Sequence, residues 1–289
     1  MKRLVLALSI VLALFPGCEE TPPFIDFTDP GDSDTGYIAD TIAGPQHKAV
    51  LIEDITGVRC VNCPNAAAKI REIVAAKSED SVIAMALYPW PTNTNSNYGN
   101  TIPYPGFPKL ANDTCSQIVE SVGIPTGLPS GYVDRYNFPP IITKTKDVVS
   151  WANLVNQRLK GNTPVNIYLK ESVSGKKITL DVKIHYTQNV SGKHKFAVYL
   201  TEDSIVSKQK GNSGEMDGYV HNHALRHTFD LAVGRPLKGT LSRGKTYDKH
   251  YEYELPSGSP IRLKHCHVVC VVMVAETDEV LNVRKIALH

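Results

Sequence analysis

Hydrophobic residues change their spacing near residue 162, and this change constrains the fold more than any other feature of the chain. From His47 to Gly161, strand-like runs alternate with amphipathic runs of helical period, which predicts an α/β layer with a central sheet. Beyond Gly161 the period is two, and seven strand candidates are separated by Gly, Ser and Pro turns. That spacing predicts an antiparallel sandwich of immunoglobulin type. We therefore expect two domains, over residues 47–161 and 162–289.

The first residues have the pattern of an export signal. Two basic residues precede an apolar run that ends at Phe15, and the run is too short to span a bilayer. A glycine stands directly before Cys18, which resembles the cleavage site of bacterial lipoproteins, where this cysteine carries the lipid. Phe15 departs from the leucine that is usual at its position, so an ordinary signal peptide is the alternative. We expect a signal peptide over residues 1–17 and membrane attachment through a lipid on Cys18.

The segment behind Cys18 carries little sign of regular structure. Residues 18–46 are rich in Pro and acidic side chains and show no sustained period, which predicts a disordered tether. Glu19 and Glu20 resemble the surface-export signal of lipoproteins in Bacteroidetes. The net charge of the whole chain is only +2, and Lys and Arg form no block, so no nucleic-acid partner is expected.

The string TGVRCVNCPNAAAKI places Cys60 and Cys63 three residues apart at the predicted start of a helix. Unpaired N–H groups and the helix dipole favour a thiolate there, and Arg59 adds a positive neighbour. The spacing puts both sulfurs on one side of a helical turn, close enough to form a disulfide. Three interpretations are open: an exchangeable disulfide, a permanent structural disulfide and a metal clip. A small loop is a poor staple, and no second pair of metal ligands stands at matching spacing, so the sequence favours exchange.

Two resemblances extend this interpretation. A strand, a cysteine pair, a helix and a strand, followed by Gly-X-Pro before another strand, are similar to the thioredoxin fold. The strings EDITGVRCVNCPNAA, GLPSGYVDR and YVHNHALR resemble the 28-kilodalton outer-membrane lipoprotein family of Bacteroidetes, from about His47 to the C-terminus. This resemblance implies an α/β thioredoxin-like domain followed by an all-β immunoglobulin-like sandwich. It also implies a lipid-anchored protein of the outer membrane, on either its periplasmic or its exposed side.

The resemblance implies roles for single residues. Cys60 matches the solvent-facing nucleophile and Cys63 the resolving thiol, so a redox-active Cys60–Cys63 disulfide would serve without any other cofactor or a metal. Pro129 is the candidate for the cis-proline that faces the disulfide, because the residues after it can run as a strand. Asp54 matches the buried acid that takes the proton of the resolving thiol, and Glu53 is the alternative. The residues between the cysteines differ from those of thioredoxins, so a redox potential cannot be transferred.

A long loop, LYPWPTNTNSNYGNTIPYPGFPKL, follows the second expected strand. It leaves from the carboxyl end of that strand, at the edge of the sheet that also carries the cysteine pair. Trp90, Tyr98, Tyr104 and Phe107 are therefore candidates for the wall of a substrate groove. The alternative is a loop that packs on its own domain with these aromatic side chains as anchors.

The other cysteines and the histidines give weaker signals. Cys115, Cys266 and Cys270 lie in a helical or apolar run and are expected to be small core residues. The histidines of HNHALRH alternate along a predicted strand, which favours packed or hydrogen-bonded side chains over a metal site. Two functions remain for the chain. One is thiol–disulfide exchange with exported proteins; the other is a non-catalytic surface-binding or adhesion module with a structural disulfide.

Overall fold

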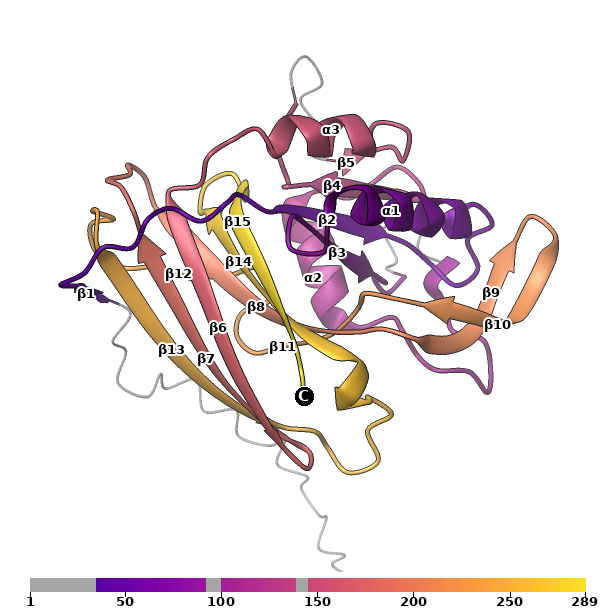
Figure 1. Ribbon diagram of the computed structural model, residues 1–289. Coiled ribbons are helices and arrows are strands. Elements are labelled where there is room, and N and C mark those ends of the chain that lie inside the picture. The colour runs from indigo at the N-terminus through magenta and orange to yellow at the C-terminus, as the bar shows by residue number, and fades with distance from the viewer. Residues whose placement is uncertain (1–34, 92–99, 139–144) are drawn as a thin grey trace, which may run out of the picture. The chain divides into compact units, whose positions relative to one another are not determined.

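The computed structural model describes residues 35–91, 100–138 and 145–289, which contain three α-helices and fifteen strands (Figure 1). The helices are α1 (Cys63–Lys77), α2 (Asp113–Val122) and α3 (Trp151–Arg158). The strands are β1 (Tyr37–Ile38), β2 (Val50–Ile55), β3 (Val82–Leu87), β4 (Ser130–Val133), β5 (Thr145–Lys146), β6 (Val165–Ser174), β7 (Lys177–Tyr186), β8 (His194–Glu202), β9 (Ile205–Gly211), β10 (Gly214–His221), β11 (Ala224–Thr228), β12 (Arg235–Pro236), β13 (Lys245–Glu254), β14 (Cys266–Val274) and β15 (Val280–Ala287). No helix among these described residues is long and apolar enough to cross a membrane.

Strands β2 and β3 form the centre of the first half of the chain. They pair in parallel, with α1 as the crossover between them, and every residue of both strands is buried. One face of the two strands packs against α1 and α3, with Ile70 and Trp151 in that core. The other face packs against α2, with Ile118 in its core. Because helices cover both faces, the strand sequences are apolar at nearly every position.

The expected fold class, a thioredoxin-like α/β domain followed by an immunoglobulin-like sandwich, is wrong. Strands from both halves of the chain belong to one mixed sheet of nine strands, in the order β15-β14-β8-β11-β3-β2-β4-β5, with β12 beside β8. The junction is β11, which pairs in parallel with β3 at Ala86 and antiparallel with β8. Residues Asp34–His289 accordingly form one compact, β-rich unit. The reason is that the edge of β3 offers free backbone groups, which β11 satisfies.

A second sheet, in the order β1-β13-β7-β6, completes the rear half (Figure 1). Its inner face packs against one face of β8 and β14, where Ile184, Val198 and Cys270 belong to one apolar core. The opposite face of β8 and β14 packs into the core beneath α2, together with Met85 of β3. The alternation of apolar residues in the rear half therefore reflects two different partners, a sheet and a helix.

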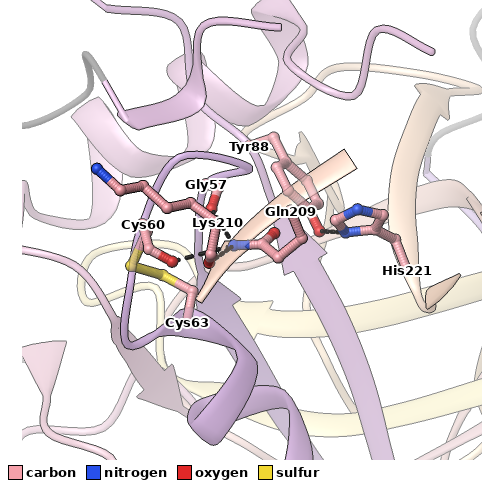
Figure 2. Close-up of a disulfide and its surroundings, with 7 residues drawn as sticks. All are labelled: Gly57, Cys60, Cys63, Tyr88, Gln209, Lys210 and His221. Carbon is pink, nitrogen blue, oxygen red and sulfur yellow. Dashed lines mark hydrogen bonds between the residues drawn. A yellow bond between two sulfur atoms is a disulfide. The ribbon is translucent and has the colours of Figure 1, made fainter. Parts of the chain in front are cut away.

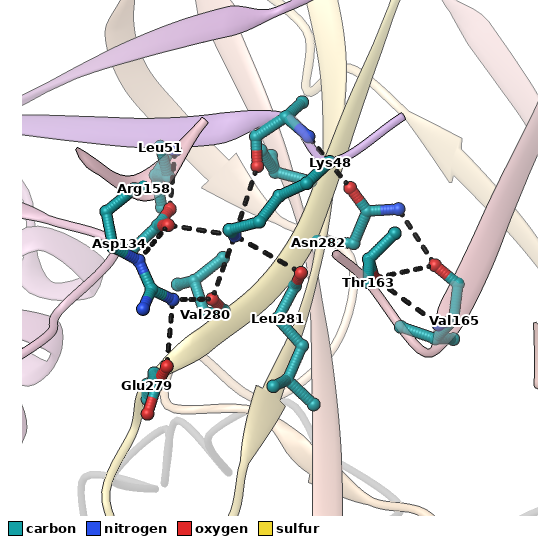
Figure 3. Close-up of polar contacts among 12 residues, drawn as sticks. Lys48, Leu51, Asp134, Arg158, Thr163, Val165, Glu279, Val280, Leu281 and Asn282 are labelled. Atoms are coloured by element: carbon teal, nitrogen blue, oxygen red, sulfur yellow. Dashed lines mark hydrogen bonds and ion pairs between the residues drawn. The ribbon is translucent and has the colours of Figure 1, made fainter. Parts of the chain in front are cut away.

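A buried polar cluster joins the two halves of the chain (Figure 3). The Asp134 carboxylate, at the end of β4, binds Lys48 Nζ and Arg158 Nε, both at 2.8 Å. Lys48 Nζ also donates to the carbonyls of Val280 and Leu281 in β15. Asp134, Lys48 and the Arg158 contacts thus bind β15 to β2, β4 and α3 through charge-assisted hydrogen bonds.

Several elements differ from the sequence expectations. Within the expected tether 18–46, the pair Tyr37–Ile38 forms β1 against β13, so regular structure begins before His47. The expected strand through HNHALRH is divided into β10 and β11, because His223 has a φ of 57°. The hairpin β9–β10 was not predicted. The signal peptide and Cys18 lie outside the described residues, and the expected domain boundary at residues 161 and 162 stays a prediction.

Candidate functional site

Cys60 and Cys63 form a disulfide at the start of α1, with their Cα atoms 5.4 Å apart. Cys63 is the first residue of the helix, Pro64 lies in its first turn, and the Cys60 N–H closes the preceding turn on the Gly57 carbonyl at 3.1 Å. The N-cap residue Asn62 makes no side-chain cap bond, and the first turn carries no acidic residue. The positive end of the helix dipole therefore acts on the cysteine pair without a competing side chain.

Both cysteines are buried, with relative exposures of 3% for Cys60 and 2% for Cys63, so the expectation of an exposed Cys60 is wrong. The hairpin β9–β10 covers the loop that carries them (Figure 2). Gln209 Nε2 donates to the carbonyls of Gly57 and Cys60, at 3.2 and 3.0 Å. The backbone N–H of Lys210, also in β9, donates to the Val58 carbonyl at 2.8 Å. The hairpin is thus bound to the cysteine loop by both backbone and side-chain hydrogen bonds.

Asp54 lies in β2 and lines the same cavity as Cys63. Its carboxyl group is buried, Oδ1 has no hydrogen-bond partner, and desolvation raises its pKa to about 8. The alternative acid, Glu53, is occupied elsewhere: both of its oxygens bind the Arg135 guanidinium, at 2.6 and 2.8 Å. Of the two acids, Asp54 is therefore the one that lines the cavity with Cys63 and has an oxygen without a hydrogen-bond partner.

The cavity beside Cys63 has a volume of about 30 Å³, the room of one or two water molecules. His221, at the end of β10, brings its imidazole to this cavity, and the Tyr88 hydroxyl lies 3.0 Å from His221 Nδ1 (Figure 2). His221 Nε2 is buried without a partner. Burial lowers the pKa of His221 to about 4, so its imidazole is neutral at neutral pH. The cavity therefore combines a cysteine sulfur, a carboxyl group and a neutral imidazole.

Two other predicted site residues have clear positions. The peptide bond Leu128–Pro129 is cis and leads into β4. This strand pairs antiparallel with Ile52–Ile55 of β2. The role of Pro129 against the disulfide stays a prediction. The Arg59 guanidinium contacts the aromatic loop. Its Nε donates to the Ile102 carbonyl at 2.8 Å, and the group stacks 4.0 Å from the Tyr104 ring centroid. Arg59 thus fastens the aromatic loop to the cysteine loop.

The aromatic candidates among the described residues pack in or against one small apolar core. Tyr104 is buried in a small apolar core with Val58, and Trp90 and Phe107 pack against that core as partly buried side chains. Tyr98 lies outside the described residues. The described part of the loop therefore matches the alternative of a loop that packs on its own domain.

The other cysteines of the described residues are buried in apolar cores, and the other histidines of HNHALRH pair with or stack on neighbouring side chains. Cys115, Cys266 and Cys270 are free and buried in the apolar cores, as expected. His223 Nδ1 lies 3.0 Å from Asp203 Oδ1, and His227 stacks on the ring of Tyr253 in β13. No group of three His, Cys, Asp or Glu residues in the described part of the chain could hold a metal ion.

Sequence reasoning missed three residues of this site: Gln209, Tyr88 and His221 as a partner of Tyr88. A signal for the hairpin was present, because the residues around Gln209 are followed by Gly-Asn-Ser-Gly, a turn sequence between two short extended runs. No local pattern marks the pair of Tyr88 and His221, since 133 positions separate them in the chain.

The family of the chain follows from its sequence. The model of the family described as outer membrane protein Omp28 matches residues 117–289. This match spans more than half of the chain, and the chain therefore belongs to the Omp28 family of outer-membrane proteins, which confirms the resemblance and the outer-membrane location. No curated protein matches the sequence significantly.

Solved structures add information about the fold. The structure "HBP35 of Porphyromonas gingivalis" is similar over 85% of this chain and 77% of its own, with a TM-score of 0.64 and 14% identity. At that identity the similarity concerns the fold alone. A domain of the outer membrane lipoprotein Omp28 from Porphyromonas gingivalis is 20% identical over 44% of this chain and 89% of its own, with a TM-score of 0.32. The chain is thus an Omp28-family outer-membrane protein with one disulfide among its described residues.

Proposed function

We propose that this protein exchanges thiols and disulfides with exported proteins through Cys60 and Cys63, while a lipid on Cys18 holds it at the outer membrane. One observation carries the proposal: the disulfide lies at a helix N-terminus, and Cys63 shares a cavity with the buried Asp54, whose Oδ1 has no hydrogen-bond partner. Burying an unpaired carboxyl group costs stability, and such groups concentrate where proteins move protons. A disulfide with only a structural role needs no such neighbour.

The chemical step follows from the oxidised state of the pair. A thiolate of an exported protein attacks Cys60 Sγ, the Cys60–Cys63 bond breaks, and Cys63 leaves as a thiolate. Asp54, which is mostly protonated at neutral pH because its pKa is raised to about 8, gives its proton to the Cys63 thiolate. A second thiolate of the partner then attacks the mixed disulfide and expels Cys60. The partner has lost two electrons and the cysteine pair has gained them; with a partner disulfide the same steps run in reverse.

This exchange requires the hairpin β9–β10 to move, because the hairpin covers the cysteine loop. The contacts that hold it include the two Gln209 bonds to the loop and the Tyr88–His221 bond. Most of the hairpin's β10 residues are exposed, and the two strands pair only with each other. A hairpin whose two strands pair only with each other can open at a smaller free-energy cost than the whole unit. We expect partner proteins to reach Cys60 in the opened state.

The alternative is a surface-binding or adhesion module whose disulfide is structural. The burial of both cysteines favours this function, because a buried disulfide is protected from attack. A surface-binding module with a structural disulfide gives no reason for the unpaired Asp54 Oδ1 at the cavity that Cys63 lines. We therefore place exchange first.

Trapping of mixed disulfides separates the two functions. In a Cys63→Ser variant Cys60 is retained as a free thiolate and the resolving thiol is lost, so Cys60 should attack disulfides of exported proteins and stay bound to those proteins as a mixed disulfide. The Cys60→Ser variant is the matched control and should trap none. Complexes would be separated on non-reducing gels and identified by mass spectrometry. If the Cys63→Ser variant traps no disulfide-bearing protein or peptide, the binding module is the better account.

A further inference from the structure

Two buried polar atoms at the cavity beside Cys63 lack a hydrogen-bond partner. They are Asp54 Oδ1 and His221 Nε2, which come from β2 and from the end of β10. Buried polar groups in folded proteins are nearly always paired, so an unpaired group requires an explanation. Here both residues line one cavity of about 30 Å³, which has room for a water molecule. The pair of atoms is therefore better treated as one arrangement than as two separate defects.

The hydrogen bond to Tyr88 decides which proton the imidazole presents to the cavity. Desolvation raises the pKa of Tyr88 well above 10, so its phenol keeps its proton and can donate it to His221 Nδ1. A neutral imidazole that accepts at Nδ1 carries its own proton on Nε2. The group that faces the cavity is then an N–H donor, and the Asp54 oxygen is an acceptor. The two atoms have complementary roles.

We propose that His221 is a positioning residue for Asp54: its Nε2–H, acting across the cavity through one water molecule, stabilises the ionised carboxylate that remains when Asp54 has given its proton to Cys63. The consequence for catalysis rests on the proposed exchange at Cys60 and Cys63. The effect on the Asp54 carboxyl group does not, because it exists in the oxidised protein without any partner.

Other charged groups near the cavity are already engaged. The titratable groups that line it besides Asp54 and His221 are Cys63, Arg71, Tyr88, Tyr219 and His223. Arg71 hydrogen-bonds the Tyr219 hydroxyl, and His223 is paired with Asp203. Cys63 is held in the disulfide and does not titrate. By hydrogen-bond geometry His221 Nε2 is the buried donor in this group without a partner, while the nearby Lys208 backbone raises the His221 pKa against the larger effect of burial.

The test is the titration of the Asp54 carboxyl carbon by NMR in the oxidised full-length chain, with carbon-13-labelled aspartate and an Asp54→Asn variant for assignment. We expect His221→Leu to raise the midpoint by about one pH unit, because a hydrogen bond to the charged form of a carboxyl group is lost. His221→Gln keeps an N–H donor near the position of Nε2 and should restore a midpoint close to that of the wild type. His227→Leu is the control, since it removes a buried imidazole that does not line the cavity.

An unchanged midpoint in a folded His221→Leu variant overturns the inference, and so does a failure of His221→Gln to restore it. If His221→Leu does not fold, Tyr88→Phe carries the test. This variant loses the phenol that fixes the imidazole proton on Nε2, so it should raise the midpoint in the same direction, and an unchanged midpoint again overturns the inference. If His221→Leu raises the Asp54 midpoint as expected and Cys63→Ser traps no mixed disulfide, the role of His221 toward Asp54 is supported and only the proposed exchange is rejected.

Discussion

The buried Asp54 carboxyl group should make the protein less stable as the pH rises, and an Asp54→Asn variant should remove this effect. Burial raises the pKa of Asp54 from an ordinary 3.8 to about 8. Between these values the unfolded chain has lost the proton and the folded chain retains it, so folding stability falls by about 1.4 kcal/mol per pH unit. At pH 7, about three units above the ordinary value, the wild type should be less stable than Asp54→Asn by about 4 kcal/mol. Near pH 4 the two proteins should differ little.

Urea denaturation of oxidised wild type and Asp54→Asn at pH 4 to 8 would measure this difference. The variant of the exposed Asp80, Asp80→Asn, is the control, and its difference from the wild type should stay flat over this range. A flat difference for Asp54→Asn would refute the reasoning, because it would mean that the carboxyl group is already ionised in the folded protein.

Three further predictions test the cover, the polar cluster and the anchor. Gln209→Ala should raise the rate of disulfide reduction by dithiothreitol roughly 5- to 30-fold, because two hydrogen bonds that hold the hairpin closed, together about 1–2 kcal/mol, are lost. Val206→Ala, at an exposed position of the same strand, should leave that rate unchanged. Asp134→Ala should lower the free energy of unfolding by about 3–5 kcal/mol, since the buried Lys48 loses its carboxylate partner and the partly buried Arg158 keeps only Glu279, whereas Lys177→Ala in an exposed ion pair should cost less than about 1 kcal/mol; equal losses in urea titrations would contradict this. Cys18→Ser should move the protein from the membrane to the soluble fraction, and retention after a high-salt wash would exclude the lipid anchor.

Local patterns predicted most of the individual elements. The apolar runs around β2 and β3 and the amphipathic run of α1 appear where the sequence places them, because their spacing and flanking turns are local properties. The disulfide, too, follows from two cysteines on one helical turn. The same patterns could not assign strands to sheets. A run of period two states which face is buried, and it does not say whether a helix or a sheet covers that face, so the joining of β11 to β3 was missed.

The candidate site was predicted in part for the same reason. Asp54 stands close in sequence to the cysteines, and the resemblance to thioredoxins made it a candidate for the buried acid. Gln209, Tyr88 and His221 come from distant segments, and their contacts depend on the return of the hairpin over the cysteine loop. The hydrogen bond from Gln209 to the Cys60 carbonyl also comes from this hairpin. Contacts of such long range have no local sequence signal.

The most direct test of the central claim is the urea dependence of disulfide reduction in the native protein. Reduction of Cys60–Cys63 by a fixed concentration of dithiothreitol would be followed by mass spectrometry at urea concentrations below the unfolding transition. If local opening of β9–β10 exposes the disulfide, the rate should depend only weakly on urea, because little surface is uncovered, and replacement of dithiothreitol by oxidised glutathione should restore the disulfide. A rate that rises with urea as steeply as the global unfolding equilibrium would show that the disulfide reacts only in the unfolded chain, and would contradict exchange as its function.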